Sequence, residues 1–133
     1  MEISFFMAMN PPTVTHQEHK VAVINGKPHF YEPPELKAAR QLLSSHLAKH
    51  RPKNKISKGC TLTAIWCFPL GKHRNREPMI KKPDTDNLQK LLKDCMTQVG
   101  FWTDDALVFS EEVMKVYNEP SGIYIKVVAD DED

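Results

Sequence analysis

Cysteine is scarce in this sequence, with only three in 133 residues. They are Cys60, Cys67 and Cys95, an odd number that contains no CxxC pair. Neither a disulfide framework nor a zinc site is therefore indicated. Cys95 falls on the apolar side of a predicted helix, and we interpret it as a core residue.

Long hydrophobic runs are also absent. The apolar run near the N-terminus is short and follows Glu2, whereas a secretory signal begins with basic residues. No stretch approaches the roughly 20 apolar residues that a membrane helix needs. We therefore expect a cytoplasmic protein with no membrane partner. At 133 residues, the chain is long enough for one domain with a core of its own.

The net charge of +1 conceals an asymmetry along the chain. Residues 37–82 contain twelve Lys and Arg residues and one acid, a net charge of +11. Residues 84–133 contain four Lys residues and twelve acids, a net charge of −8. This division is expected when one part of a protein binds a polyanion and another binds a metal ion. The DNA-binding candidates are the cations of the loop that leads into the first acids, Lys72, Arg74, Arg76, Lys81 and Lys82.

The most informative stretch is a predicted amphipathic helix that ends at Gly100. Apolar residues from Leu88 to Val99 recur at the i, i+3, i+4, i+7 spacing of one helical face. Pro83 precedes the helix, and Asp84 or Asp86 can cap its first turn. Three polar residues one turn apart fall on the opposite side, Asp86, Lys90 and Asp94, and we interpret Asp94 as a partner of Lys90.

Two more acids, Asp104 and Asp105, precede an apolar run over residues 106–109 that we predict to be a strand. Each acidic pair alone is commonly structural, as a helix cap or a solvated turn. Together, and beside Lys81 and Lys82, they favour a metal site, because gathered carboxylates repel one another unless a cation neutralises them. Oxygen donors without interleaved Cys or His favour Mg²⁺ or Mn²⁺. Such ions assist the cleavage of phosphodiesters.

One signature links the helix to the second acidic pair. It consists of Lys82-Pro83-Asp84-Thr85-Asp86-Asn87-Leu88, then Lys90 and Asp94, then Gly100-Phe101-Trp102, Asp104-Asp105-Ala106 and Val108. It spans about a fifth of the chain and resembles the signature of the RusA family of Holliday-junction resolvases. The resemblance implies a small homodimeric, Mg²⁺-dependent endonuclease that cuts four-way DNA junctions. It also implies that Asp84, Asp86 and Asp105 bind the metal and that Lys90 assists.

The choice of Asp105 over Asp104 agrees with strand geometry, since neighbouring side chains on a strand point to opposite faces. The implied reaction is metal-assisted hydrolysis by a twofold dimer, in which each subunit makes one of the two nicks that resolution needs. Apolar edge strands and the Phe101-Trp102 corner are our candidates for the dimer surface.

Periodicity and turn residues predict the remaining elements. We expect a helix over residues 35–49 and strands over residues 3–9, 20–24, 27–31, 61–68, 113–117 and 122–128. Asn25-Gly26 is a strong signal for a two-residue hairpin turn. The predicted fold is a single α+β domain over residues 1–133, with a mostly antiparallel sheet of four or five strands and two helices. The acidic residues at about 129–133 are expected to form a disordered tail.

A non-catalytic, structure-specific DNA-binding domain is the main alternative, in which the acids serve as caps and repel phosphates. A phosphatase built on Asp-x-Asp would place that motif after a hydrophobic strand, whereas Lys81-Lys82-Pro83 precedes it here. A calcium loop would need a glycine after the acids and a closing Glu. The sequence fits either a prophage gene or a host repair gene, and either one or two metal ions per site.

Overall fold

The computed structural model describes residues 1–15 and 20–130. The main sheet has the strand order β1-β6-β4-β5, and β2 and β3 form a separate two-stranded sheet. None of the described helices is long and apolar enough to cross a lipid bilayer. The predicted α+β class is confirmed. In chain order the elements are β1 (Glu2–Ala8), β2 (Lys20–Ile24), β3 (Lys27–Tyr31), α1 (Pro34–Ala48), β4 (Cys60–Phe68), α2 (Thr85–Val99), the 3₁₀ turn η2 (Asp105–Leu107), β5 (Val108–Tyr117) and β6 (Gly122–Ala129).

The main sheet is mixed rather than purely antiparallel. β6 pairs antiparallel with both β1 and β4, as the predicted sheet requires. β4 and β5, in contrast, run parallel. Parallel neighbours need a long crossover connection, and α2 lies on the chain between these two strands and supplies it. The β4–α2–β5 unit therefore places α2, and the acids near its ends, next to β5.

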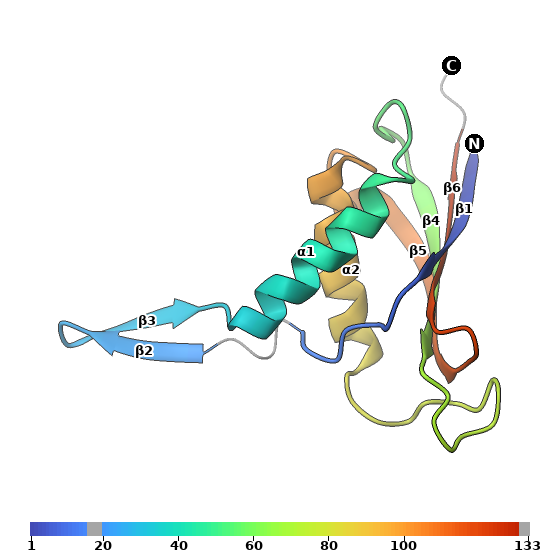
Figure 1. Ribbon diagram of the computed structural model, residues 1–133. Coiled ribbons are helices and arrows are strands. Elements are labelled where there is room, and N and C mark those ends of the chain that lie inside the picture. The colour runs from blue at the N-terminus through green and yellow to red at the C-terminus, as the bar shows by residue number, and fades with distance from the viewer. Residues whose placement is uncertain (16–19, 131–133) are drawn as a thin grey trace.

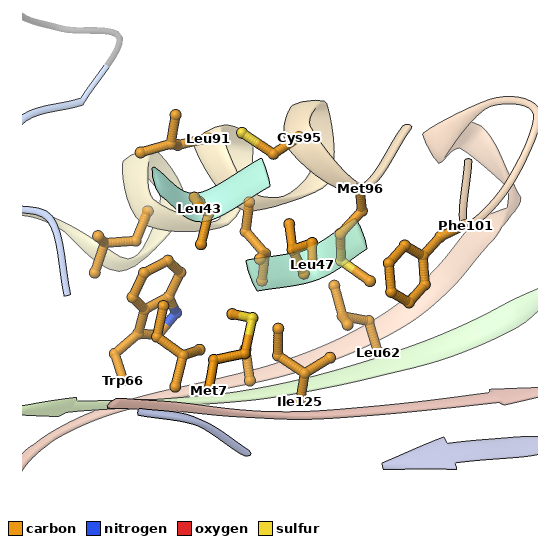
Figure 2. Close-up of a cluster of buried hydrophobic side chains, with 14 of the residues drawn as sticks. Met7, Leu43, Leu47, Leu62, Trp66, Leu91, Cys95, Met96, Phe101 and Ile125 are labelled. Atoms are coloured by element: carbon orange, nitrogen blue, oxygen red, sulfur yellow. The ribbon is translucent and has the colours of Figure 1, made fainter. Parts of the chain in front are cut away.

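Both helices cover one face of the main sheet (Figure 1). The residues of β4 alternate between the two faces, and Leu62, Ala64 and Trp66 are buried beneath the helices. Figure 2 shows Leu43 of α1 and Leu91 of α2 on the helical side of this core. Burial of each large apolar side chain contributes about 1.5–3 kcal/mol, so the core fixes how both helices lie on the sheet.

Phe101 and Trp102 belong to the same core. Both side chains are 0% exposed in a single chain. Trp102 Nε1 also donates a hydrogen bond to Thr97 Oγ1 at 2.7 Å, so its polar atom is satisfied within the chain. The interpretation of this corner as a dimer surface is therefore wrong: the two rings close the end of the core instead.

α2 forms as its apolar periodicity predicts, and Gly100 ends it with a left-handed φ of 97°. The backbone N–H groups of Gly100 and Phe101 both donate to the carbonyl oxygen of Met96, which completes the last turn. Asp84 occupies the N-cap position as expected. Its side chain, however, caps none of the first-turn N–H groups, all of which lie in the described part of the chain. Capping therefore does not explain this acid.

The hairpin predicted around Asn25-Gly26 has the predicted boundaries. Asn25 and Gly26 have φ values of 52° and 75°, as a type I′ turn requires. At the other end of the chain, Ala129 is the last residue of β6 and is buried, so it is not part of a tail. Asp130 is exposed, and residues 131–133 of the predicted tail lie outside the described residues.

The three cysteines are all buried free thiols. Burial raises the pKa of Cys60, Cys67 and Cys95. A buried thiol with a raised pKa is a poor nucleophile and a poor metal ligand at neutral pH. Cys95 packs in the core, as predicted.

Gly122, at the start of β6, has no room for a side chain. Its φ is 158°, and a Cβ atom there would overlap the carbonyl oxygen of Met7 and the ring of Phe6. We expect Gly122→Ala to lower the free energy of unfolding by at least about 2 kcal/mol, because the backbone of β1 would have to move. Urea unfolding measures this loss. Gly59→Ala is the control, since its Cβ would meet the exposed Phe109 ring at 3.1 Å and a backbone atom, the Leu107 oxygen, only at 3.9 Å. Equal losses in both variants would contradict the explanation.

Candidate active site

The two acids of the Asp-x-Asp sequence lie at the N-terminal end of α2. Asp84 is the N-cap residue and Asp86 lies in the first turn. Both are exposed, as is Lys90 one turn after Asp86. They are exposed because Leu88 and Leu92 bury the other side of the helix. The N–H groups at a helix N-terminus also favour anions, which suits this end to carboxylates and phosphates.

The two acids after α2 differ in their local roles. Asp104 is the N-cap of η2, and its Oδ1 accepts a hydrogen bond from the Ala106 N–H at 2.9 Å. Asp105 is half-buried and lines two adjoining hollows beside α2. The strand predicted over residues 106–109 starts only at Val108, after the 3₁₀ turn. The carboxyl groups of Asp104 and Asp105 therefore differ in their roles because of a capping turn, not because of strand alternation.

Asp86 and Asp105 line one open pocket of about 440 Å³ between α2 and β5. A second hollow brings Asp86 together with Asp84 and Lys82. Asp86 belongs to both hollows and so links the Asp84 side to the Asp105 side. All four predicted catalytic residues, Asp84, Asp86, Lys90 and Asp105, thus line two hollows that share Asp86. The complete lining of the first pocket is Thr85, Asp86, Gln89, Lys90, Lys93, Asp105, Glu111 and Val113.

The predicted metal ligands line these two hollows, but they do not form one cluster around a single ion. Within residues 1–15 and 20–130, no three His, Cys, Asp or Glu side chains lie close enough to hold a metal ion together. A single chain therefore offers an ion in the pocket two predicted carboxylates, Asp86 and Asp105, rather than a closed cage of acids.

Glu111 of β5 is an acid of this pocket that sequence reasoning missed. Trp66 Nε1 donates to Gln89 Oε1 at 2.9 Å, and Gln89 Nε2 donates to Glu111 Oε2 at 3.1 Å. Lys93 Nζ lies 3.0 Å from the other oxygen of Glu111. Gln89 is only 3% exposed, so breaking its hydrogen bonds would leave a buried amide unsatisfied. The strand alternation that puts Glu111 on the same face as Val113 was the signal that could have identified it.

Lys115 of β5 is a second residue that the sequence did not single out. Its Nζ donates to the carbonyl oxygens of Lys81 at 2.6 Å and Pro83 at 2.8 Å. These two residues lead directly into Asp84. Lys115 therefore ties the approach to α2 onto β5, on the strand face that also carries Glu111.

The predicted DNA-binding cations are all exposed, and two of them line different hollows. Lys82 lines the hollow that also contains Asp84 and Asp86. Arg76 lines a groove with Ile65 and Met114, on the sheet face that the helices leave uncovered. The full set is Lys72, Arg74, Arg76, Lys81 and Lys82.

The loop that carries these cations is itself ordered by side-chain contacts. His73 stacks on Tyr117 with ring centroids 3.7 Å apart, and its Nδ1 bonds to Glu77. The hydrogen bond from His73 lowers the pKa of Glu77. The Met79 N–H also donates to the carbonyl oxygen of Lys115 at 3.0 Å. The loop thus runs along the edge of β5, and its cations lie beside the sheet.

Asp94 approaches the other helix. Its Oδ2 lies 4.0 Å from Nη2 of Arg40 in α1, and Arg40 Nε donates to Glu32 at 2.7 Å. Asp94 thus takes part in an ionic link between the two helices. Its partnership with Lys90 stays a prediction.

Comparison with known proteins relates this arrangement to a family. A family model described as "Endodeoxyribonuclease RusA" matches residues 10–128. The "Crossover junction endodeoxyribonuclease rusA" of Lactococcus phage r1t is 28% identical over 130 residues, which are 96% of this chain and 98% of the phage protein.

Two further relatives differ in how much of the chain they match. The "Uncharacterized protein YqaN" of Bacillus subtilis is 25% identical over an alignment of 118 residues, which covers 80% of this chain and 82% of that protein. The "Crossover junction endodeoxyribonuclease RusA" of Escherichia coli K12 is 46% identical over 39 residues, 29% of this chain and 32% of that protein. Because the family model spans most of the sequence, this chain belongs to the RusA family of endodeoxyribonucleases.

Proposed function

We propose that this protein resolves Holliday junctions and related branched DNA by paired nicks, with Mg²⁺ held by the acids near the two ends of α2. The observation that carries the proposal is the shared pocket, in which Asp86 and Asp105 lie on common walls with Lys90. The substrate class is taken from the names of the phage and Escherichia coli relatives, which are crossover junction endodeoxyribonucleases.

The side chains around this pocket fit a hard divalent cation. The acids lining it, Asp86, Asp105 and Glu111, offer carboxylate oxygens, while the thiols are buried elsewhere. Mg²⁺ is usually held by one or two carboxylates, and waters and substrate phosphates complete its octahedral shell. We assign Asp84, Asp86 and Asp105 as ligands, directly or through water, and Mn²⁺ suits the same donors.

The residues of the chain would position the DNA strand for hydrolysis. A divalent cation bound here would supply Lewis-acid activation of the scissile phosphate and of the attacking water. Lys93 is already paired with Glu111 at 3.0 Å. Lys90 is therefore the lysine that we assign to offset charge on the phosphate or the leaving oxygen. The loop cations Lys72, Arg74, Lys81 and Lys82 would hold the flanking phosphates. Arg76 instead lines the apolar groove on the uncovered face of the sheet.

Resolution of a junction needs two symmetrical nicks, so we propose a twofold homodimer with one site in each subunit. The uncovered face of the main sheet is our candidate for the dimer surface. Met114 is 54% exposed there, and it lines an apolar groove with Ile65, Val116 and Tyr124. Pairing of two such faces would remove this apolar surface from water.

The alternative function is a non-catalytic, structure-specific DNA-binding domain. The absence of a three-acid cluster within the described residues 1–15 and 20–130 favours it. Digestion of a synthetic mobile four-way junction, beside linear and flap DNA and with or without Mg²⁺, separates the two functions. We expect cutting of the junction only with Mg²⁺. Protein that binds the junction but stays inert in Mg²⁺ would establish the alternative.

The neighbouring acids Asp104 and Asp105 provide a matched pair of variants. We expect Asp105→Asn to lower the rate of junction cutting by at least about 100-fold, because it removes a charge from the pocket. Asp104→Asn should cut at nearly the wild-type rate, since the Asn side-chain oxygen can still accept the Ala106 N–H. Single-turnover cutting of a labelled junction measures both rates. Equal losses of cutting rate in the two variants would show that Asp105 has no special role in the site.

Lys81 and Lys82 should bind phosphates without regard to sequence. We expect the double variant Lys81→Ala/Lys82→Ala to weaken junction binding and to reduce the slope of log K against log[salt] by about 1 for each phosphate that a lysine no longer neutralises. Binding titrations at several salt concentrations measure this slope. Lys53→Ala is the control, because Lys53 is exposed and lies with Met1 and Ala129 at the other end of the sheet. An unchanged slope in the double variant would mean that the DNA lies elsewhere.

Lys115 should act by positioning the approach to Asp84 rather than by touching DNA. We expect Lys115→Met to remove two hydrogen bonds, to cost about 1 kcal/mol of stability and to speed amide exchange in residues 81–86. Exchange mass spectrometry measures the local loosening, and the cutting rate should fall while junction affinity changes little. Lys53→Met is the matched control, at the other end of the sheet. Unaltered exchange in residues 81–86 would show that Lys115 does not hold this loop.

A further inference from the structure

The β2–β3 hairpin, residues 20–31, stands apart from the rest of the fold, and we name it the arm. It projects away from the helices and the main sheet (Figure 1). Within the described residues its strands pair only with each other. An isolated two-stranded hairpin is marginally stable in water at best. We therefore expect a binding partner to stabilise the arm.

The tip of the arm is apolar and uncovered. Val23 is 75% exposed and Ile24 is 51% exposed, immediately before the Asn25-Gly26 turn. The rest of the arm is basic rather than acidic. Lys27 and His29 are exposed on β3, and the sequence from 20 to 31 contains two lysines and no acid. An apolar tip on a cationic hairpin is complementary to a polyanion that also presents apolar base faces.

The segment that precedes the arm in the chain lies beside the acidic end of α2. Thr13 and Thr15 precede the arm in the chain and line the hollow that contains Asp84 and Asp86. At the other end of the arm, Glu32 accepts a hydrogen bond from Arg40 at 2.7 Å, which ties it to α1. DNA bound at the acids would therefore lie near the point where the arm leaves the body.

We infer that the arm is a DNA-binding element whose tip, Val23 and Ile24, packs against bases at the branch point of the junction. Apolar side chains inserted between bases unstack them, and the cost is a few kcal/mol per step in a duplex. That cost is lower where continuous base stacking is already interrupted, as at a branch point. Lys27 and the arm's lack of acids favour DNA over a protein surface. This inference rests on the proposed junction substrate.

The test uses a four-way junction with 2-aminopurine beside the branch point, in Ca²⁺ so that binding is measured without cutting. Wild-type protein should raise the fluorescence, because the base loses its stacking. The double variant Val23→Thr/Ile24→Thr keeps β-branched side chains and so keeps the strand propensity. We expect it to lose most of the fluorescence rise and about tenfold in junction affinity, with unchanged affinity for linear duplex.

Leu42→Gln is the matched control, because Leu42 is 48% exposed on α1, away from the tip. It should behave as wild type. A fluorescence rise in the double variant equal to that of wild type would overturn the role of the tip. A fall in sedimentation mass of the double variant would overturn it too, by showing that the arm joins two copies of the chain. Wild-type protein that fails to bind the junction at all would instead overturn the proposed function.

Discussion

The rest of this structure depends on how α2 is seated against β4 and β5. Its leucines fill the core above Trp66, and Gln89 lies at the seam with its amide bonded to both Trp66 and Glu111. A buried amide with two specific partners tolerates little rotation of the helix, because rotation would leave polar atoms unsatisfied. The exposed side of α2 is thereby fixed. Asp86 and Lys90 line the pocket beside β5 together with Gln89.

The crossover from β4 through α2 to β5 brings the acids before and after α2 to the same strand. The chain enters α2 past Lys81 and Pro83, whose carbonyl oxygens Lys115 of β5 holds. It leaves α2 at Gly100 and reaches Asp105 through a capped 3₁₀ turn. Both acidic ends of the segment are therefore anchored to one strand. The separation of the carboxylates along the helix explains why they line two hollows that share Asp86 rather than a closed cage.

Local patterns in the sequence predicted most elements. The 3.6-residue period of Leu88 to Val99 gave α2, and Asn25-Gly26 gave the hairpin, since both depend on neighbours in the chain. The parallel pairing of β4 with β5 depends on strands distant in sequence, and periodicity does not encode it. Asp105 was chosen over Asp104 from family resemblance and an assumed strand. The structure has a capping turn there, so the geometric reason was wrong. Glu111, Gln89 and Lys115 were missed because their roles come from contacts across the β4–α2–β5 unit.

We propose that Asp86 and Asp105 both contribute to the binding of one divalent ion. Electron paramagnetic resonance of free Mn²⁺ measures that binding directly, in wild-type protein and in Asp86→Asn and Asp105→Asn variants. Either substitution should weaken the same class of Mn²⁺ site by at least about tenfold, a loss of about 1.4 kcal/mol. Mn²⁺ binding that is unaffected by the loss of Asp105 would contradict the claim, because the ion would then be held without the acid that follows α2.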